Sequence, residues 1–464
     1  MSRTMVLDVA GLSTGLLTEM PALKALAGRG AVLPLEPVLP ALTLPMQATF
    51  TTGRPPARHG IVANGLYFAD AAEVRFWEQS ARLLGAPRAW ARASEPRVQQ
   101  AAPLVTRAAR KKERRADLKS QIGNLRFKIA HLFWQLGMYD PTIDVLLTPK
   151  PVHAPGDRLL VDCYSKPADL YRRLAADLGP FDLRTYWGPM AGIGSSRWIA
   201  QAALAVWTNE RPDLCLVYLP QLDYSGHRAG PASDAHRADA RELDAVLKPL
   251  VDAAEADGAR LVVLSEYSFL PAARPVALNR ALREAGFLAV REIEGGEYLY
   301  TGDSRAFAMV DNQVAHVYFP AAEDLDGDIR AVRALLEKVP GVARVLDRAA
   351  QGAAGLDHVR SGDLVVLAEP DAHFVYYWWL DDARAPAFAR TVDIHSKPGF
   401  DAAELFFDPA ARGIPLSAGA VRGSHGLVLE DGRGWGVYLD SDPPRDLAGR
   451  QAVRAAQVAR LAMV

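Results

Sequence analysis

Short apolar runs recur along the chain, and three of them lead into polar residues. The first is Met5-Val-Leu-Asp8, the second covers residues 214–219, and the third, residues 260–264, leads into Ser265-Glu266-Tyr267. Apolar runs without alternation suit strands that are buried on both faces, as in a parallel sheet. Helical periodicity lies between them, at 21–30 and 235–258. The pattern predicts an α/β protein with a central, mostly parallel sheet flanked by helices.

The pattern changes twice along the chain. An irregular segment contains a basic run at 107–115 and an apolar-rich stretch at 123–138 that predicts a helix. The basic run is interpreted as a solvated helix face, with an anion- or partner-binding patch as the alternative. Later, short strands surround one helix, which is typical of a smaller inserted α+β cap domain. We therefore expect a core at 1–286 with a helical insert near 90–200, a cap at 287–385, and a return to the core at 386–464.

Polar side chains that can bind a cation follow the predicted strands. Asp8 ends the first strand, and Asp223 and His227 come directly after the second. Open α/β folds place ligands at the carboxyl ends of their strands, and a carboxylate and an imidazole four residues apart can reach one ion. This pair of ligand types suits zinc and related ions. A turn-capping role is the alternative for Asp8.

The segment that begins at Pro37 organises the N-terminal half. In Pro40-Ala-Leu-Thr43-Leu-Pro45 the two prolines bracket Thr43, so that an extended entry leads into a helix start. A hydroxyl at that position lies beside free backbone N–H groups and the positive end of the helix dipole, which together favour an anion. A helix-capping role is the alternative for Thr43.

This segment resembles the nucleophile segment of the nucleotide pyrophosphatase/phosphodiesterase branch of the alkaline phosphatase superfamily. After Thr43 come Thr52-Gly53-Arg-Pro-Pro56-Ala-Arg-His59-Gly60-Ile61 and then Asn64, in the family's order. The resemblance continues in Asp223-Tyr-Ser-Gly226-His227-Arg-Ala-Gly230-Pro231 and in Gly423-Ser-His425-Gly426. It implies an alkaline-phosphatase-like core in which Thr43 is the nucleophile and Asn64 donates to a non-bridging phosphate oxygen.

The resemblance also implies two divalent metal ions, with zinc expected and manganese or magnesium as alternatives. Carried over by motif, the ligands of the first ion are Asp223, His227 and His425, and those of the second are Asp8, Thr43 and Glu266. The sequence departs from the family where Glu266-Tyr267 replaces Asp-His. A neutral phenol is a poor ligand, because its unperturbed pKa is about 10. Our hypothesis for the missing ligand is His395, with a supporting or core role as the alternative.

Two dications would clamp the attacking and leaving oxygens of a phosphoryl transfer, and one of them would activate the Thr43 hydroxyl. The expected function is hydrolysis of phosphodiester or pyrophosphate bonds in nucleotide-like substrates through a covalent phosphothreonine. Lys397 is expected to hold a substrate phosphate, with plain solvent exposure as the alternative. Phosphomonoester or phosphonate hydrolysis is a second interpretation. A metal-poor binding protein without turnover is the third, because of Glu266-Tyr267.

Composition and charge limit the kinds of binding partner that we expect for this chain. A formal net charge of −1 over 464 residues provides no bulk attraction to nucleic acid, so the expected partner is a small phosphorylated substrate. The only cysteines are Cys163 and Cys215, which argues against a disulfide framework or a thiolate zinc site. The chain shows no secretory signal pattern and no apolar run long enough to span a bilayer, so we expect a cytoplasmic protein. The sequence predicts no particular oligomeric state.

Overall fold

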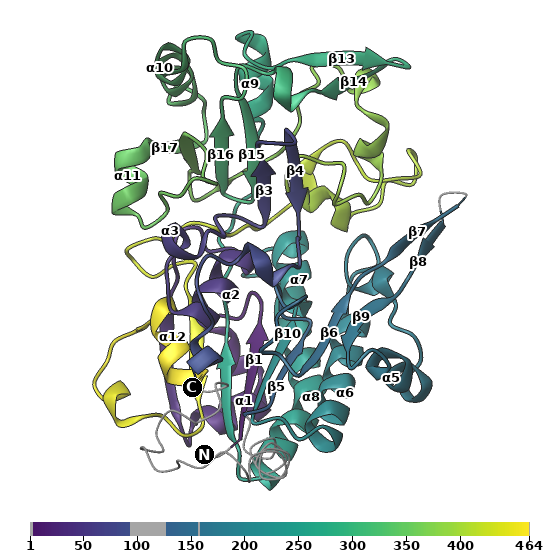
Figure 1. The fold of residues 1–464 in the computed structure, drawn as a ribbon, viewed down its shortest axis with the longest axis vertical. Coiled ribbons are helices and arrows are strands. Elements are labelled where there is room, and N and C mark those ends of the chain that lie inside the picture. The colour runs from purple at the N-terminus through teal and green to yellow at the C-terminus, as the bar shows by residue number, and fades with distance from the viewer. Residues whose placement is uncertain (1–2, 93–126, 156–157, 464) are drawn as a thin grey trace, which may run out of the picture.

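The computed structural model describes residues 3–92, 127–155 and 158–463. One large sheet fills the lower half of Figure 1, and its described strands run in the order β21-β2-β20-β11-β1-β10-β5-β6-β9. In chain order these strands are β1 (Thr4–Val9), β2 (Ala31–Glu36), β5 (Ile129–Leu132), β6 (Val145–Pro149), β9 (Cys163–Lys166), β10 (Leu214–Leu219), β11 (Arg260–Leu264), β20 (Gly436–Asp440) and β21 (Val453–Arg454).

The middle of this sheet is parallel. β1 pairs in parallel with both β10 and β11, so that Asp8 lies opposite Tyr218 on one neighbour and Leu264 on the other. β5 and β6 continue the parallel order beyond β10. β20 runs antiparallel to β11 and β2, and β9 runs antiparallel to β6. The predicted α/β class with a mostly parallel central sheet is confirmed.

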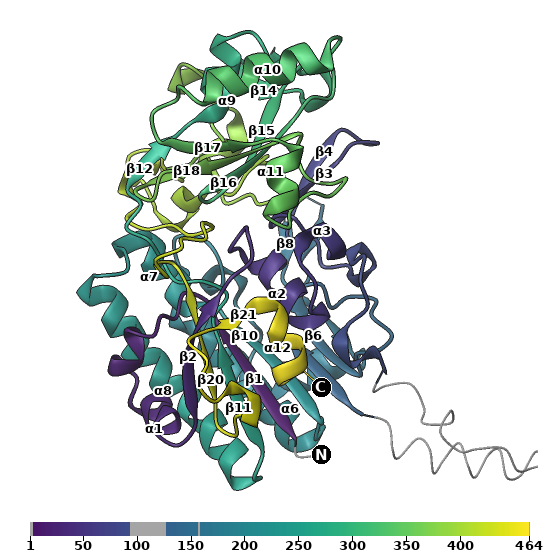
Figure 2. The same ribbon diagram turned by 90° about the vertical axis from the view of Figure 1, so that its left-hand side faces the viewer.

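Helices cover both faces of the sheet, as Figure 2 shows. One face carries α1 (Pro21–Ala27), α6 (Ile193–Asn209) and α8 (Asp234–Ala256), and the other carries α2 (Thr43–Thr52) and α12 (Ala455–Ala462). Side chains alternate along a strand, so Met5 and Leu7 of β1 join the apolar core on the α8 side, whereas Val6 joins the core on the α2 side. Asp8, two residues after Val6, therefore points to the side of α2.

A smaller antiparallel sheet lies above the large one in Figure 1. Its strands run in the order β15 (Phe307–Asp311), β16 (Val314–Tyr318), β18 (Leu364–Ala368) and β17 (Val342–Leu346), with α9 (Leu278–Glu284), α10 (Leu325–Leu336) and α11 (Arg348–Ala353) around it. This mixture of short strands and helices is the arrangement expected for that part of the chain. The apolar core of the smaller sheet also takes in Val276 and Val421, and the predicted domain boundaries at 286 and 385 stay a prediction.

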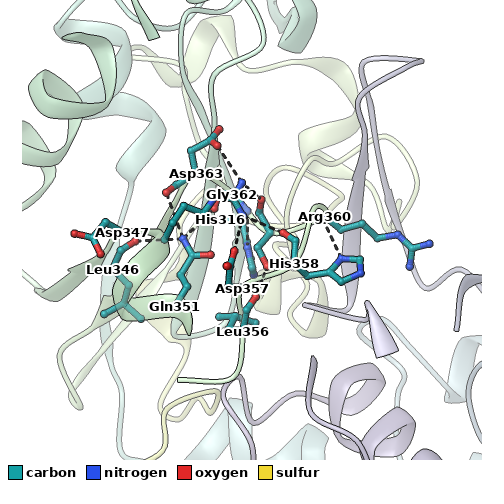
Figure 3. Close-up of polar contacts among 12 residues, drawn as sticks. His316, Leu346, Asp347, Gln351, Leu356, Asp357, His358, Arg360, Gly362 and Asp363 are labelled. Carbon is teal, nitrogen blue, oxygen red and sulfur yellow. Dashed lines mark hydrogen bonds and ion pairs between the residues drawn. The ribbon is translucent and has the colours of Figure 1, made fainter. Parts of the chain in front are cut away.

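Polar contacts join the smaller sheet to the loop after α3 (Pro56–His59). His316 on β16 accepts a hydrogen bond from the backbone N–H of Gly362 (3.1 Å; Figure 3), and its Nε2 donates to the carbonyl of Val62 (3.2 Å). Arg360 donates to the carbonyl of Gly60 (3.0 Å). His316 therefore has a structural role between the smaller sheet and the loop after α3.

The helix predicted at 123–138 is wrong over its described part. Residues 129–132 form β5, and β6 and β9 follow, so this segment adds strands to the central sheet, and the first helix after it is α5 (Leu170–Leu178). A short, wholly buried apolar run fits a strand or a helix equally well, and pairing with β10 decides the matter here. The basic run at 107–115 lies outside the described residues.

Smaller paired strands complete the described part of the chain. They are β3 (Gly65–Phe68) with β4 (Glu73–Phe76), β7 (Val152–Ala154) with β8 (Arg158–Leu160), β12 (Arg274–Val276) with β19 (Ala372–Phe374), and β13 (Val290–Ile293) with β14 (Gly296–Leu299). Across the described ranges, no helix combines the length and the apolarity that a bilayer span requires.

Candidate active site

Polar side chains from separate segments meet at one edge of the central sheet. Asp8 lies near the end of β1, α7 (Gln221–Ala229) follows β10, and Glu266 comes shortly after β11. These three strands are parallel neighbours, so their carboxyl ends lie at the same edge. The loop before β20 brings His425 to the same place, and all of these side chains are buried.

Asp223, His227 and His425 form a cluster in which one ligand atom of each lies within 4.8 Å of the others. Nε2 of each imidazole is 3.7 Å from Oδ1 of Asp223. His227 Nδ1 donates to the carbonyl of Gly423 (3.0 Å), and His425 Nδ1 donates to the carbonyl of Ala41 (2.9 Å). A carbonyl only accepts hydrogen bonds, so each Nδ1 carries the hydrogen and each Nε2 keeps its lone pair for a ligand.

The electrostatics of this cluster suit a cation. Burial lowers the pKa of His227 to about 4 and the pKa of His425 well below its usual value, so both rings are neutral near pH 7. Burial raises the pKa of Asp223 to about 7. Within the described ranges, Nε2 of His227 is buried without a hydrogen-bond partner. A divalent ion would coordinate that nitrogen and compensate the buried carboxylate, so the three residues fit the first predicted metal site.

Thr43 is the first residue of α2, but its hydroxyl does not cap the helix. The N-cap is Leu42, and no side chain makes a capping hydrogen bond. The hydroxyl oxygen of Thr43 lies 3.3 Å from Oε2 of Glu266 and 3.4 Å from the hydroxyl of Tyr267. The capping alternative is therefore wrong, and the hydroxyl faces the polar groups at the edge of the sheet.

Gln47 is a site residue that the sequence analysis missed. Its Nε2 donates to Oδ2 of Asp8 (2.9 Å) and to Oε1 of Glu266 (2.8 Å). Its Oε1 accepts from the backbone N–H of Gln135 (2.7 Å), which fixes the orientation of the amide because an N–H group cannot accept. Gln47 lies four residues after Thr43, on the same face of α2, and that spacing is the signal that could have found it.

Tyr267 links Thr43 to the metal-ligand cluster. Its hydroxyl donates to Oδ1 of Asp223 (3.0 Å), and its ring stacks on His425, with centroids 3.5 Å apart and 5° between the planes. Burial and the nearby Asp223 and Glu266 carboxylates raise the pKa of the phenol well above its usual value, so the phenol stays neutral. A phenol thus stands where the family has an imidazole ligand of the second ion, and the amide of Gln47 binds two of the carboxylates predicted for that ion.

A family model described as type I phosphodiesterase / nucleotide pyrophosphatase matches residues 4–401. This chain belongs to that family. The family consists of phosphoric ester hydrolases of the alkaline phosphatase superfamily, so the resemblance drawn from the Thr43 segment is confirmed.

Solved structures support the same fold. Phosphonoacetate hydrolase from Sinorhizobium meliloti 1021, in complex with phosphonoacetate, matches 99% of this chain and 94% of its own, with a TM-score of 0.58 and 17% sequence identity. An inactive form of murine ectonucleotide pyrophosphatase / phosphodiesterase 5, in complex with AMP, matches 99% and 93%, with a TM-score of 0.57 and 13% identity. At these identities the likeness shows the fold, and the alkaline-phosphatase-like core is confirmed.

The pKa values of Asp8 and Glu266, the two carboxylates predicted to bind the second ion, are strongly shifted. Burial raises the pKa of Asp8 to about 7, and burial together with the adjacent Asp8 raises the pKa of Glu266 well above its usual value. Oδ1 of Asp8 is buried without a hydrogen-bond partner among the described residues. The amide hydrogens of Gln47 bind one oxygen of each carboxylate, and the raised pKa values show that burial outweighs these two hydrogen bonds.

Asn64 supports the start of α2. Its Oδ1 accepts from the backbone N–H of Leu44 (2.9 Å), and its Nδ2 donates to Oδ1 of Asp311 (3.2 Å). The bond to Asp311 uses one amide hydrogen, and the predicted bond to a phosphate oxygen would use the other. His59, in the same motif as Asn64, is buried with its Nε2 3.0 Å from the Thr49 hydroxyl.

Lys397 does not have the substrate role that was predicted for it. Its side chain is buried, and its ammonium donates to Asp401 (2.8 Å), to Glu404 (2.7 Å) and to the carbonyl of Thr391 (2.9 Å). An ammonium has three hydrogens, so all of them are used inside the fold and none is left for a phosphate.

The hypothesis that His395 supplies the missing ligand is also wrong. His395 lies in an exposed turn, where its backbone N–H donates to Oδ1 of Asp393 (3.0 Å). Asp8 and Glu266 are fully buried, so the fold does not bring this imidazole together with them.

An aromatic wall adjoins the metal-ligand cluster. The ring of Phe400 lies 5.4 Å from the ring of His227, and the ring of Trp187 lies 5.5 Å from that of Phe400. A cavity of only about 10 Å³ beside these rings is also lined by Phe76 and Trp77 and by the charged side chains of Lys397, Asp401 and Glu404. Apolar surface next to a polar cluster suits the organic group of a phosphate ester.

Proposed function

We propose that this chain hydrolyses phosphodiester or pyrophosphate bonds in nucleotide-like substrates through a phosphothreonine intermediate. A divalent ion, with zinc as the first candidate, would be held by Asp223, His227 and His425. The observation that supports this most strongly is the Thr43 hydroxyl, which lies 3.4 Å from the phenol that also binds Asp223. The nucleophile and the cation-binding cluster are therefore joined by a single side chain.

When bound, the ion would stabilise negative charge on the phosphate oxygens. Thr43 would attack phosphorus while the bond from phosphorus to the leaving oxygen breaks. The hydroxyl proton would pass to Oε2 of Glu266, which lies 3.3 Å away. Water would then cleave the phosphothreonine and regenerate the hydroxyl. Asn64 would donate to a non-bridging oxygen, and the aromatic wall would contact the organic group.

Phosphonate or phosphomonoester hydrolysis is the second candidate. It is favoured by the fold similarity to phosphonoacetate hydrolase, which covers nearly the whole of both chains. A binding protein without turnover is the third candidate, because Tyr267 stands where the family has a histidine ligand. A cytoplasmic location stays a prediction.

An assay with three substrates separates these candidates. Initial rates would be measured with bis(p-nitrophenyl) phosphate, p-nitrophenyl phosphate and phosphonoacetate, with added Zn²⁺ or Mn²⁺ and with EDTA. We expect diester turnover that EDTA and His425→Ala abolish. His316→Asn is the matched control, because this buried histidine contacts only the backbone of Val62 and Gly362 in its described hydrogen bonds. Turnover of only the monoester or the phosphonate would select the second candidate, and no turnover with any substrate would refute both hydrolase proposals.

A further inference from the structure

We propose that this chain holds one divalent cation rather than two, and that the side-chain amide of Gln47 takes the position of the second. Tyr267 completes the replacement by bridging from Thr43 to Asp223. The inference rests on the proposed use of Asp223, His227 and His425 as a cation site. It concerns the other half of the site, around Asp8 and Glu266.

The side-chain amide of Gln47 binds one oxygen of each carboxylate in the predicted second site. Nε2 of Gln47 carries two hydrogens and has no lone pair available for a metal. One hydrogen goes to Oδ2 of Asp8 (2.9 Å) and the other to Oε1 of Glu266 (2.8 Å). The same amide thus joins the two carboxylates that were predicted to hold the second ion. The amide therefore links the two carboxylates by hydrogen bonds instead of a cation.

The amide is held in this orientation from its other side. Oε1 of Gln47 accepts from the backbone N–H of Gln135 (2.7 Å), in the segment that follows β5. A rotated amide would set its own N–H₂ group against that N–H and its oxygen against two carboxylates. Gln47 is also fully buried, on a helix whose residues are all buried, so no solvent is present to compensate a displaced amide.

Tyr267 removes the remaining ligand position. Its phenol donates to Oδ1 of Asp223 (3.0 Å), and its ring lies flat against His425 at 3.5 Å. Stacking on one side and a hydrogen bond at the tip hold the ring in place. The partners of the Thr43 hydroxyl are consequently the Glu266 carboxylate and a neutral phenol, which is a poor metal ligand.

Counting bound cations tests the inference without any measurement of turnover. The full-length protein would be saturated with Zn²⁺, desalted, and analysed for zinc per chain, and the experiment would be repeated with Mn²⁺. We expect one ion per wild-type chain and none in His425→Ala. The combined variant Gln47→Ala, Glu266→Asp, Tyr267→His restores the family's ligand types and should bind two.

Gln351→Ala is the matched control for the loss of a buried glutamine. Its Nε2 donates to the carbonyls of Gly362 (3.0 Å) and Leu346 (3.4 Å) in the smaller sheet, as Figure 3 shows. This variant should keep one ion per chain.

The number of cations bound per wild-type chain tests the inference even if the combined variant does not fold. Two ions per wild-type chain, with one lost in Asp8→Asn, would overturn the inference and leave the proposed function standing. A count of zero would remove the proposed cation site and this inference together.

Discussion

The Thr43 hydroxyl has two partners of different chemistry, a carboxylate at 3.3 Å and a phenol at 3.4 Å. Only Glu266 can take the proton, because the phenol of Tyr267 is neutral and already donates to Asp223. Neither Glu266 nor Tyr267 needs the Thr43 hydroxyl to hold its side chain in position. Glu266 keeps its bond from Gln47, and Tyr267 keeps Asp223. At the scale of single residues, the nucleophile can therefore be removed without dismantling its surroundings.

Thr43→Ala should lower kcat for the diester by about 10³-fold or more, because the attacking oxygen is lost. The melting temperature should stay close to that of the wild type. Thr43→Ser keeps the oxygen and is the matched control, with activity well above that of the alanine variant. Initial rates and thermal melts measure both. Wild-type turnover in Thr43→Ala would mean that another group is the nucleophile.

At the scale of elements, the approach of α7 to the turn after β11 positions the cation ligands. Gly226 lies on α7 between Asp223 and His227, and a Cβ atom there would be 2.4 Å from Cε2 of Phe269. The ring of Phe269 stands nearly perpendicular to the ring of His227, 4.9 Å away. Because Gly226 has no side chain, α7 can lie close enough for Asp223 and His227 to cluster with His425.

Gly226→Ala should push α7 away from Phe269. We expect a loss of about 1–3 kcal/mol in the free energy of unfolding, as for other overpacked sites, and weaker Zn²⁺ binding. Gly352→Ala is the control, because nothing lies within 4 Å of a Cβ atom at that position of α11. The control should be neutral or stabilising by up to about 1 kcal/mol, with unchanged Zn²⁺ binding. Urea unfolding and Zn²⁺ titration measure both effects. Equal Zn²⁺ affinity in the two variants would contradict the role given to Gly226.

At the scale of the whole molecule, buried ionisable groups couple stability to pH in opposite directions. Burial lowers the pKa of His316 to about 4 and raises the pKa of Asp311 to about 7. When the pH falls below about 6.5, the His316 ring takes up a proton in the unfolded chain but stays neutral in the folded protein. The free energy of unfolding therefore decreases as the pH falls from about 6.5 towards 4. The buried Asp311 changes the free energy of unfolding with pH in the opposite direction. Its contribution is present below the unfolded pKa of about 4 and is lost as the pH rises through about 7.

His316→Gln should therefore weaken the loss of stability on acidification. The slope of the unfolding free energy against pH between about 4 and 6.5 should fall by up to about 1.4 kcal/mol per pH unit, which corresponds to one proton. Asp311→Asn should change the slope with the opposite sign, because it removes a group that takes up a proton on folding. Urea unfolding at a series of pH values measures both slopes. Equal slopes in the wild type and His316→Gln would show that this imidazole is not held neutral by burial.

The sequence by itself determined the buried strands and the chemistry at their ends. A wholly apolar run such as residues 214–219 has few places in a folded domain outside a central strand, and parallel neighbours bring their carboxyl ends to one edge. The positions of Asp8, Asp223 and Glu266 directly after such runs are therefore enough to predict that they lie together. His425 was placed by its motif, because no local pattern relates it to residues some two hundred positions earlier.

Only the tertiary structure decided how the second half of the site is filled. Gln47 and Glu266 are 219 residues apart, and they meet because the fold brings Gln47 of α2 to the carboxyl ends of β1 and β11. The fold likewise buried Lys397 against two carboxylates and left His395 in solvent, although both had looked available in the sequence. Residue types limit which groups can ligate or donate. Long-range packing decides which of them meet, because a hydrogen bond depends on distances of about 3 Å that no spacing along the chain specifies.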